Sequence, residues 1–436
     1  PYELAWRQAA NAFKNICARC ARQLKDPSTF TALLEHTERC IASVRPNFDN
    51  PDERDERTNV MEGLARVIAR MPIAQASQAS ARIIAPVIAK CKLLVAEVAS
   101  TSAPASPEAS RAMAAELSLI ASVVRFLEFS PNANVEHPAI SVLGAVWPTL
   151  EEIARSPAWR ATCVASSLSP IYIPALLSAK AKSVDVLVPM LESIARSFSA
   201  TKEPCFLEPV STAIEIASTS SSETGTSEIF PNAPHVGTAL GAAFVQIVNE
   251  IAACALAHPS SAESWERADA LFTTTRAFII FAPAHGLANE ALFTALDLAV
   301  QALELKEYGP VRSSLALLNA LIAPGEKSKT SPPWVANAAR VDEFLASRGA
   351  RLVQTILVAA SSGITPRVAI RSACTFLATL LERAREVVTP WILDALAQGN
   401  AQNAEAAAAA AAAMARILTK PTPLNRARTI SALCDY

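Results

Sequence analysis

Apolar residues recur along almost the whole chain at spacings of three and four residues. Two stripes illustrate the pattern: Val60, Leu64, Val67, Ile68 and Met71, and then Ala291, Leu292, Ala295, Leu296, Ala299 and Val300. This spacing brings side chains onto one side of a helix with 3.6 residues per turn. The sequence therefore predicts about twenty amphipathic helices of roughly 12 to 24 residues each.

Short breaks that contain Pro, Ser, Asn or Asp separate the stripes. Proline lacks an N–H and is tolerated best in the first turn of a helix or just beyond its end. We therefore expect helices to end or begin at these breaks: Lys25–Ser28, Arg45–Phe48, Met71–Pro72, Ser130–Asn132, Ala282–Pro283, Ala323–Gly325 and Thr389–Pro390.

The rhythm of helix, short turn and helix matches a repeat architecture. Two helices in about 40–47 residues is the period of HEAT and armadillo repeats, and it divides the chain into about ten helix pairs. The units show no strong residue-level similarity to one another, and a multi-helix globular bundle would produce similar stripes. We expect an all-α, HEAT-type helical-repeat solenoid (an α-α superhelix) over residues 1–436, without a domain boundary.

Several polar stretches interrupt the helical pattern. Low hydrophobicity and many small polar residues are typical of surface loops. Such loops are predicted at Asp49–Arg57, Ser100–Ser110, Ser218–Pro234 and Pro324–Pro333. The alanine run Ala406–Ala413 is of low complexity, but alanine is the best helix former, so it is predicted to continue a helix.

Composition supports the helical interpretation. Glycine contributes only 11 of 436 residues, well below a usual share of about 7%, which leaves little material for tight β-hairpins. Hydrophobic residues make up 51% of the chain, but charge or proline interrupts each long apolar stretch before the ~20 residues that span a bilayer. We expect no membrane partner. The start, Pro1-Tyr2-Glu3-Leu4, lacks the features of a signal peptide and looks like a chain entered partway through.

Charge and cysteine usage point to protein partners inside the cell. The chain has 39 basic and 40 acidic residues and a formal net charge of −1. Binding to nucleic acid needs a concentrated basic surface, so no direct nucleic-acid partner is expected. The nine cysteines are an odd number scattered through helical segments, which favours free thiols in a reducing compartment.

Motifs for catalysis are missing from the sequence. It contains no glycine-rich phosphate loop, no Gly-x-Ser-x-Gly turn and no His-Glu-x-x-His pair. Glu151 and Glu152 are adjacent and so do not converge on one substrate, and we expect them on a solvated face. We nominate no catalytic, cofactor-binding or metal residue and expect that the chain is not an enzyme. Surface or packing roles are expected for all five histidines: His36, His137, His235, His258 and His285.

One cysteine pair needs separate treatment. Cys17 and Cys20 form a Cys-x-x-Cys, which can be a redox motif or half of a zinc site. A thioredoxin-like site needs a βαβ unit, whereas this pair lies in a helical stretch. A zinc site needs a second ligand pair, for which His36 and Cys40 are the nearby candidates. We favour a third interpretation, in which both thiols pack in the core.

Eight segments, spread in order along the chain, carry a family resemblance. They are Phe13–Cys20, Val60–Pro72, His137-Pro138, Val146–Leu150, Pro204–Leu207, Ala270–Phe278, Arg351–Leu357 and Trp391-Ile392. In this order and at similar spacing they resemble the C-terminal half of nuclear transport receptors of the importin-β superfamily, in its transportin-3/importin-13 branch. Within them, Trp147 is expected to be a large buried ring at the beginning of a helix, followed by Pro148.

The resemblance implies a receptor that carries protein cargo through nuclear pores and shuttles between nucleus and cytoplasm. It also implies contacts with FG nucleoporins and with the Ran GTPase, the latter mainly through N-terminal repeats that this chain lacks. No cofactor is implied. Two alternatives to a transport receptor remain. The first is a generic HEAT-repeat scaffold for protein–protein assembly, and the second is an α-helical enzyme.

One departure from the family pattern concerns cargo. Receptors of this branch hold phosphorylated Arg-Ser cargo with an arginine-rich helix between the Trp-Pro helix and the Cys-Phe-Leu helix. Here the interval Ala161–Pro170 contains no arginine, and Arg160 lies only at its edge. The sequence therefore gives no support for phospho-Arg-Ser recognition by that helix.

Overall fold

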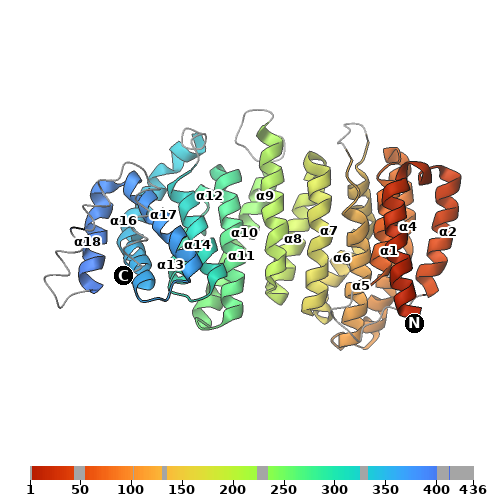
Figure 1. Ribbon diagram of the computed structural model, residues 1–436, viewed down its shortest axis with the longest axis horizontal. Coiled ribbons are helices and arrows are strands. Elements are labelled where there is room, and N and C mark those ends of the chain that lie inside the picture. The colour runs from red at the N-terminus through yellow and green to blue at the C-terminus, as the bar shows by residue number, and fades with distance from the viewer. Residues whose placement is uncertain are drawn as a thin grey trace. The chain divides into compact units, whose positions relative to one another are not determined.

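A computed structural model describes residues 2–43, 55–101, 103–129, 135–222, 234–324, 332–399 and 412. In these ranges all regular secondary structure is helical (Figure 1). The helices are α1 (Tyr2–Leu24), α2 (Pro27–Ser43), α3 (Arg57–Ile68), α4 (Ile73–Thr101), α5 (Pro107–Val124), α6 (Pro138–Arg155), η1 (Pro157–Trp159), α7 (Thr162–Ala179), η2 (Lys180–Ser183), α8 (Val184–Thr201), η3 (Pro204–Phe206), α9 (Leu207–Ser222), α10 (Pro234–Ala257), α11 (Ala262–Phe281), α12 (Pro283–Ala288), α13 (Leu292–Ala302), α14 (Tyr308–Ile322), α16 (Pro332–Ser361), α17 (Arg367–Arg383) and α18 (Arg385–Gly399).

The chain divides into two compact units. The first comprises residues 1–220 and 232–239, and the second comprises residues 221–231 and 240–436. The division falls near the end of α9 and within α10, so it lies beside the polar stretch Ser218–Pro234. The expectation of one undivided domain over residues 1–436 stays a prediction.

Helices of the first unit pack in two rows. In one row α1 contacts α3, α3 contacts α5, and α5 contacts α7. In the other row α4 contacts α6, and α6 contacts α8. Neighbours in sequence join the rows, as α4 does with α5 and α6 with α7, and Figure 1 shows α5 to α8 side by side in chain order. Alternate helices that stack in this way are the arrangement of helix-pair repeats.

Helices of the second unit follow the same rule. One row runs from α11 through α14 to α17, and the other runs from α12 through α16 to α18. The helix α13 packs against α11 and α14. At the start of the unit, the Phe244 ring of α10 stacks on the Phe278 ring of α11 with centroids 5.1 Å apart.

The prediction of an all-α, HEAT-type helical-repeat solenoid is confirmed. Both example stripes are buried, and the second coincides with α13 and its N-cap Ala291. The first stripe differs in one respect, because α3 is buried on nearly every side rather than on one face. Helix α3 ends at Ile68, so Met71 reaches the core from the turn that follows.

Most described breaks are confirmed, but the one at Thr389-Pro390 is wrong. Helices end and begin around Pro27, Pro72, Pro283 and Pro324 as expected. Pro390 instead lies inside α18, which begins at Arg385, directly after α17. Its ring is exposed, so the carbonyl that it leaves without an intrahelical partner is on the side of the helix that faces water.

The placement of Trp147 at the beginning of a helix is also wrong. Helix α6 begins at Pro138, which His137 precedes as N-cap, and Trp147-Pro148 lies in the middle of the helix. Pro148 and Gly144, one turn earlier, are both exposed, so the disrupted hydrogen bond is again at the surface. The Trp147 ring is half-buried rather than buried.

All four predicted loops are shorter than the sequence indicated. Arg57 is buried and begins α3, and the Ser100–Ser110 stretch narrows to the few residues between Thr101 and Pro107. Helix α9 extends to Ser222, and α16 begins at Pro332. The remaining expectations lie outside the described residues: the breaks Arg45–Phe48 and Ser130–Asn132, the rest of the loops, and the alanine run except Ala412.

Among the described residues, two helices are long and apolar enough to cross a membrane when judged by length and composition alone. They are Thr162–Ala179, of which 50% is buried, and His235–Ala257, of which 44% is buried. In the first, Leu168, Tyr172 and Leu176 are among the buried side chains, so packing within the first unit accounts for much of its hydrophobicity. The expectation of no membrane partner stays a prediction.

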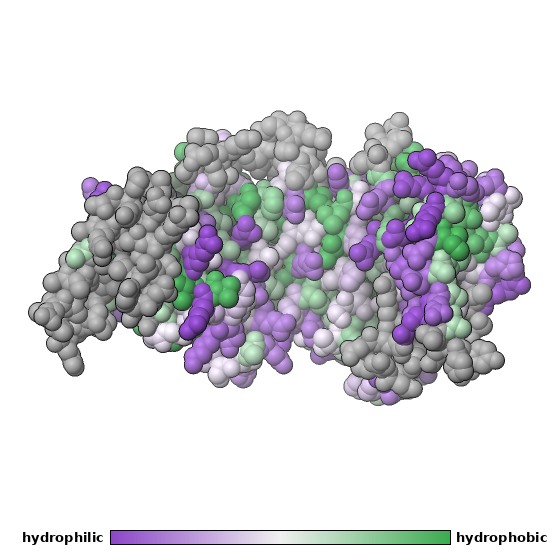
Figure 2. All heavy atoms as spheres, in the orientation of Figure 1, coloured by the Kyte–Doolittle hydropathy of each residue, from purple (hydrophilic) through white to green (hydrophobic). Residues whose placement is uncertain are grey.

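The first helix presents a polar face to solvent. From Ala5 onward, where the side chains of α1 are described, only Ala10, Cys17 and Ala21 are buried, a narrow stripe along its contact with α3. Hydrophilic side chains gather over α1 on the face drawn in Figure 2. Two of its basic residues form ion pairs with α3 and the turn before it: Arg7 with Glu56 at 3.0 Å, and Lys14 with Glu62 at 3.8 Å.

Candidate functional site

His137 connects three segments of the first unit. It caps α6, because its Nδ1 accepts a hydrogen bond from the backbone N–H of Ala139 at 3.2 Å. An Nδ1 that accepts leaves the proton of the neutral ring on Nε2, which lies 3.3 Å from the carbonyl oxygen of Phe129 and 3.3 Å from the Ser178 hydroxyl. Burial lowers the pKa of His137 below its ordinary value. His137 therefore has a packing role, as expected, because it connects α6, α7 and residues 127–129.

Glu151 of α6 is not on a solvated face, contrary to the sequence-based expectation. Its carboxylate pairs with Arg155 at 2.6 Å and with Arg196 of α8 at 3.3 Å, and its side chain is only 14% exposed. Glu152 is exposed, as expected. The contact to Arg196 could not be read from the local pattern, because it joins two helices that are neighbours only in the folded row.

Tyr172 of α7 packs beside this pair of helices. Its ring lies 6.3 Å from that of Trp147, at an interplanar angle of 54°. Burial of the phenol, with a smaller effect from the Glu151 carboxylate, raises the pKa of Tyr172. The phenol therefore stays protonated at neutral pH, and the Trp-Pro segment of the family resemblance works as packing between α6 and α7.

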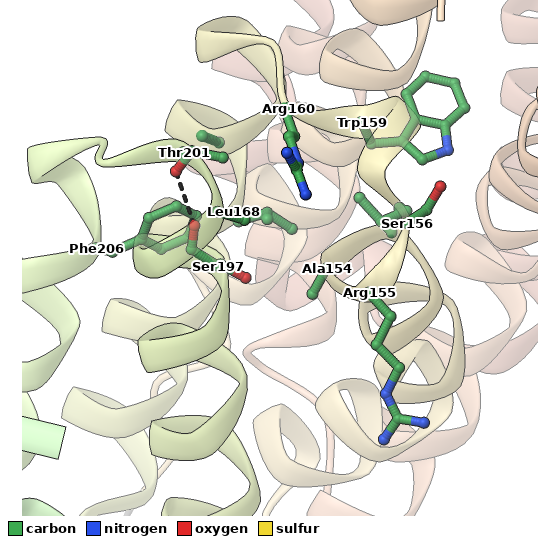
Figure 3. Close-up of a pocket in the computed structure, with 12 residues that line it drawn as sticks. Ala154, Arg155, Ser156, Trp159, Arg160, Leu168, Ser197, Thr201 and Phe206 are labelled. Carbon is green, nitrogen blue, oxygen red and sulfur yellow. Dashed lines mark hydrogen bonds between the residues drawn. The ribbon is translucent and has the colours of Figure 1, made fainter. Parts of the chain in front are cut away.

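A small recess lies where α6 ends and α7 begins, beside the interval Ala161–Pro170. Leu168 and Phe206 are part of its apolar lining, and Ser156, Ser197 and Thr201 supply polar groups. Figure 3 shows the Arg160 side chain between Thr201 on one side of the recess and Ser156 on the other. The Arg155 side chain points away from the recess, toward the side on which it pairs with Glu151. The Thr201 hydroxyl donates a hydrogen bond to the Ser197 carbonyl oxygen at 2.8 Å.

The recess is too small for a phosphorylated side chain. Its volume is about 30 Å³, close to the share of a single water molecule in liquid water. Arg160 is the one exposed guanidinium that reaches it, so the paired arginine forks that hold a phosphate are not formed by its lining. The geometry therefore agrees with the sequence in giving no support for phospho-Arg-Ser recognition here.

The Cys-x-x-Cys pair is divided between core and surface. Cys17 is completely buried as expected, but Cys20 is exposed, which corrects the placement of both thiols in the core. The stripe of α1 that contacts α3 is narrow, and Cys20 lies beyond its edge, with backbone angles that leave the helical region (φ −103°, ψ 15°). Burial raises the pKa of Cys17 to about 12, so this thiol is protonated and unreactive at neutral pH.

The zinc alternative gains nothing from the described residues. His36 is exposed, and its Nδ1 lies 2.9 Å from an Arg39 guanidinium nitrogen, while the side chain of Cys40 lies outside the described residues. Within the described ranges, no three His, Cys, Asp or Glu side chains converge in a way that could hold a metal ion.

The second unit contains a larger opening between α13 and α16. Its volume is about 360 Å³, and it is lined by Asp297, Val300, Gln301, Ser347, Arg348 and Arg351. Successive turns of α13 meet successive turns of α16 along it. Phe293 stacks on Phe344 with centroids 6.3 Å apart, Asp297 pairs with Arg348 one turn later, and Gln301 and Arg351 follow. We call this opening the α13–α16 cleft.

Arg348 is held firmly in one wall of the cleft. Its Nε and one terminal nitrogen donate to the two carboxylate oxygens of Asp297, the second at 2.8 Å, and the other terminal nitrogen donates to the Ser347 hydroxyl at 2.8 Å. The hydrogen bond to Asp297 raises the pKa of the guanidinium further above neutral pH. The Arg348 and Arg340 guanidinium carbons lie 5.5 and 5.2 Å from the centre of the Phe293 ring, which adds cation–π attraction.

Comparisons with known proteins bear on the fold. No family model matches the chain, and no curated protein matches it. A solved structure of Importin13 in its cytosolic state superposes on 98% of this chain with a TM-score of 0.75, at 14% sequence identity. The fold is an importin-β-like helical solenoid. The chain spans 45% of the length of the Importin13 chain, so the likeness concerns part of that protein.

Sequence reasoning missed the contact between α13 and α16 and the cleft beside it. Arg340, Phe344 and Arg348 recur at four-residue intervals, which is a signal that they share one side of a helix. Nothing in the sequence indicates that Phe293 and Asp297, about fifty residues earlier, would face them. In an importin-β-like solenoid such pairs are set by the stacking of successive repeats.

Proposed function

We propose that the chain is the cargo-side, C-terminal part of a nuclear transport receptor in the transportin-3/importin-13 branch of the importin-β superfamily. Such a receptor binds protein cargo, contacts FG nucleoporins, responds to Ran mainly through repeats outside this chain, and shuttles between nucleus and cytoplasm. The proposal includes that the chain is not an enzyme, and that it binds neither nucleic acid nor membranes directly.

The observation that carries the proposal is the likeness to Importin13 over nearly the whole chain. The ordered segments from Phe13–Cys20 to Trp391-Ile392 support the same branch independently of the coordinates. The near-neutral charge suits a surface that binds proteins rather than phosphate backbones.

A generic HEAT-repeat scaffold is the second candidate. The same two rows of helices would serve an assembly platform, because function is carried by surface sites rather than by a fold. The two candidates differ in their response to Ran. A transport receptor of the import type releases its cargo when Ran-GTP binds, whereas a scaffold has no reason to respond.

The test uses the full-length gene product immobilised with a bound partner protein. Addition of Ran loaded with a non-hydrolysable GTP analogue should release the partner, and Ran loaded with GDP should not. Partner binding that is indifferent to both forms of Ran would reject the transport-receptor assignment and favour the scaffold.

A further inference from the structure

We propose that the α13–α16 cleft binds an acidic side chain of an extended protein segment, with Arg351 as the group that receives the carboxylate. The inference rests on the proposed function only in requiring a protein partner, and it adds the chemistry of the segment that is bound. It concerns the second unit alone.

The cleft has the dimensions of a side-chain site. Its volume of about 360 Å³ lies in the range of small-ligand pockets, which begin at about 300 Å³. Val300 belongs to the lining but is only 3% exposed, so it closes the cleft on one side and the polar side chains make up most of the accessible wall.

The charges of the lining leave one cation available. Asp297 and Arg348 neutralise each other through two parallel hydrogen bonds, and the remaining nitrogen of Arg348 is taken by Ser347. Arg351 lies one helical turn beyond Arg348, is exposed, and has no ion pair or hydrogen bond to another described residue. The lining contains two arginines and one aspartate, so its net charge is +1. Arg351 is the arginine that has no partner among the described residues.

Contacts of the neighbouring residues hold the wall of the cleft beside Arg351 in place. Arg348 is fixed by Asp297 and by the Phe293 ring, and Phe293 itself stacks on the fully buried Phe344. Arg340 donates to the carbonyl oxygen of Asn289 at 3.3 Å, which attaches the same side of α16 to the segment before α13. A guanidinium on such a wall offers a planar fork that matches a carboxylate. Gln301, on the facing helix, adds an amide N–H to the lining.

Direct binding of a defined peptide to the chain tests the proposal. The probe is a short fluorescein-labelled peptide of alternating glutamate and serine with an amidated C-terminus, measured by fluorescence anisotropy. Saturable binding is expected, weakened by added salt, and binding should be lost when every glutamate of the peptide is replaced by glutamine. An otherwise identical glutamine peptide with a free C-terminus separates side-chain recognition from recognition of a chain end.

Variants of exposed arginines identify the site. Arg351→Gln should weaken binding by about three- to tenfold, the loss expected for one ordinary hydrogen bond at an exposed site, and Arg351→Glu should weaken it further. The control is Arg371→Gln, which removes an exposed arginine from α17 with the same change in net charge. Thermal unfolding of each variant, followed by circular dichroism, checks that the fold is kept.

Equal affinities of Arg351→Gln and Arg371→Gln would overturn the proposal, as would undiminished binding of the glutamine peptide. Binding of the free-C-terminus glutamine peptide alone would also reject it, because the ligand would then be a chain end. The result is distinguishable from the test of transport function, since no Ran is present. If the Ran response were absent, peptide binding would be unchanged. If peptide binding were absent, the Ran response would be unchanged.

Discussion

At the scale of single residues, His137 shows how a buried polar side chain can organise helix ends. Its ring caps α6 through Ala139 and approaches the backbone of residues 127–129 and the Ser178 hydroxyl. The Ser178 hydroxyl in turn donates to the Leu127 carbonyl oxygen. All of these bonds suit a neutral imidazole, and a proton on Nδ1 would remove the acceptor that caps the helix.

The stability of the first unit should therefore depend on pH through His137. Its pKa is lowered in the folded protein, while the unfolded chain keeps a value of about 6.5. As pH falls through 6.5, the unfolded state takes up a proton that the folded state refuses, so the free energy of unfolding decreases. The loss becomes complete only below the folded pKa.

The measurement is urea unfolding followed by circular dichroism at a series of pH values between 8 and 5. His137→Asn keeps an N-capping side chain but does not titrate, so it should reduce the pH slope of the unfolding midpoint. His36→Asn serves as control, because His36 is exposed on α2. A slope that His137→Asn leaves unchanged would show that the titration lies elsewhere.

At the scale of elements, the close approach of α1 to α3 depends on a glycine. A methyl group added at Gly63 would come within 2.9 Å of the Phe13 ring and 3.3 Å of the Lys14 Cα. Because Lys14 Cα belongs to the backbone of α1, the helix as a whole would have to move to relieve the second contact. Gly63 belongs to the Val60–Pro72 segment of the family resemblance, and its role follows from helix packing.

Alanine substitutions at two glycines should have opposite effects. Gly63→Ala is expected to destabilise the first unit by about 1–3 kcal/mol, as overpacking does. Gly144→Ala on α6 meets nothing within 4 Å, and should stabilise by about 0.5–1 kcal/mol because alanine is the better helix former. Chemical denaturation of both variants gives the comparison, and a loss at both positions, or at neither, would contradict the packing argument.

A buried ion pair connects α3 to α5. Arg57 donates to Glu116 at 2.8 Å and, through its Nε, to Asp55 at 2.8 Å, and the side chains of Arg57 and Glu116 are each only 7% exposed. Hydrogen bonds and ion pairs to the two carboxylates hold the pKa of Arg57 above its ordinary value, although burial alone would lower it. Such a pair is costly to break from one side, because the remaining charge has lost its partner.

Removal of one or both partners of this pair should therefore give unequal losses. Arg57→Met is expected to cost about 3–5 kcal/mol of unfolding free energy, and the double variant Arg57→Met with Glu116→Leu should recover part of the loss. Denaturant titration of the single and double variants yields the coupling. Strictly additive losses would mean that the two side chains do not interact in solution.

The sequence predicted the helical class, the buried stripes and most of the breaks, because these depend on local spacing. It failed where a local signal was overridden. Pro148 and Pro390 read as helix boundaries but lie inside helices with their rings exposed to water. Cys20 is one helical turn from the buried Cys17 and yet is exposed, because the contact stripe of α1 is narrow.

The candidate sites were less predictable than the fold. Contacts such as Glu151 with Arg196 and Asp297 with Arg348 join residues about fifty positions apart, and these depend on how successive helices stack. Helical periodicity shows which residues share one face of a helix, but it does not show which other helix that face packs against. The size of the recess at Arg160 likewise depends on how the helices pack, so it could not be predicted from the sequence.

At the scale of the whole molecule, each of the two units is built from stacked helices. Helix-pair arrays bind partners over long faces that successive repeats build together. The net charge of −1 leaves such faces free of strong attraction to polyanions. These properties agree with the proposed role in binding proteins, and the likeness to part of Importin13 concerns the fold.

Passage through nuclear pores is the most direct test of the transport assignment. In permeabilised cells supplied with Ran and an energy-regenerating system, the fluorescently labelled full-length gene product should accumulate in nuclei. An inert protein of equal size should stay outside under the same conditions. Exclusion of the labelled product together with the inert protein would contradict the assignment and leave a helical scaffold as the better account.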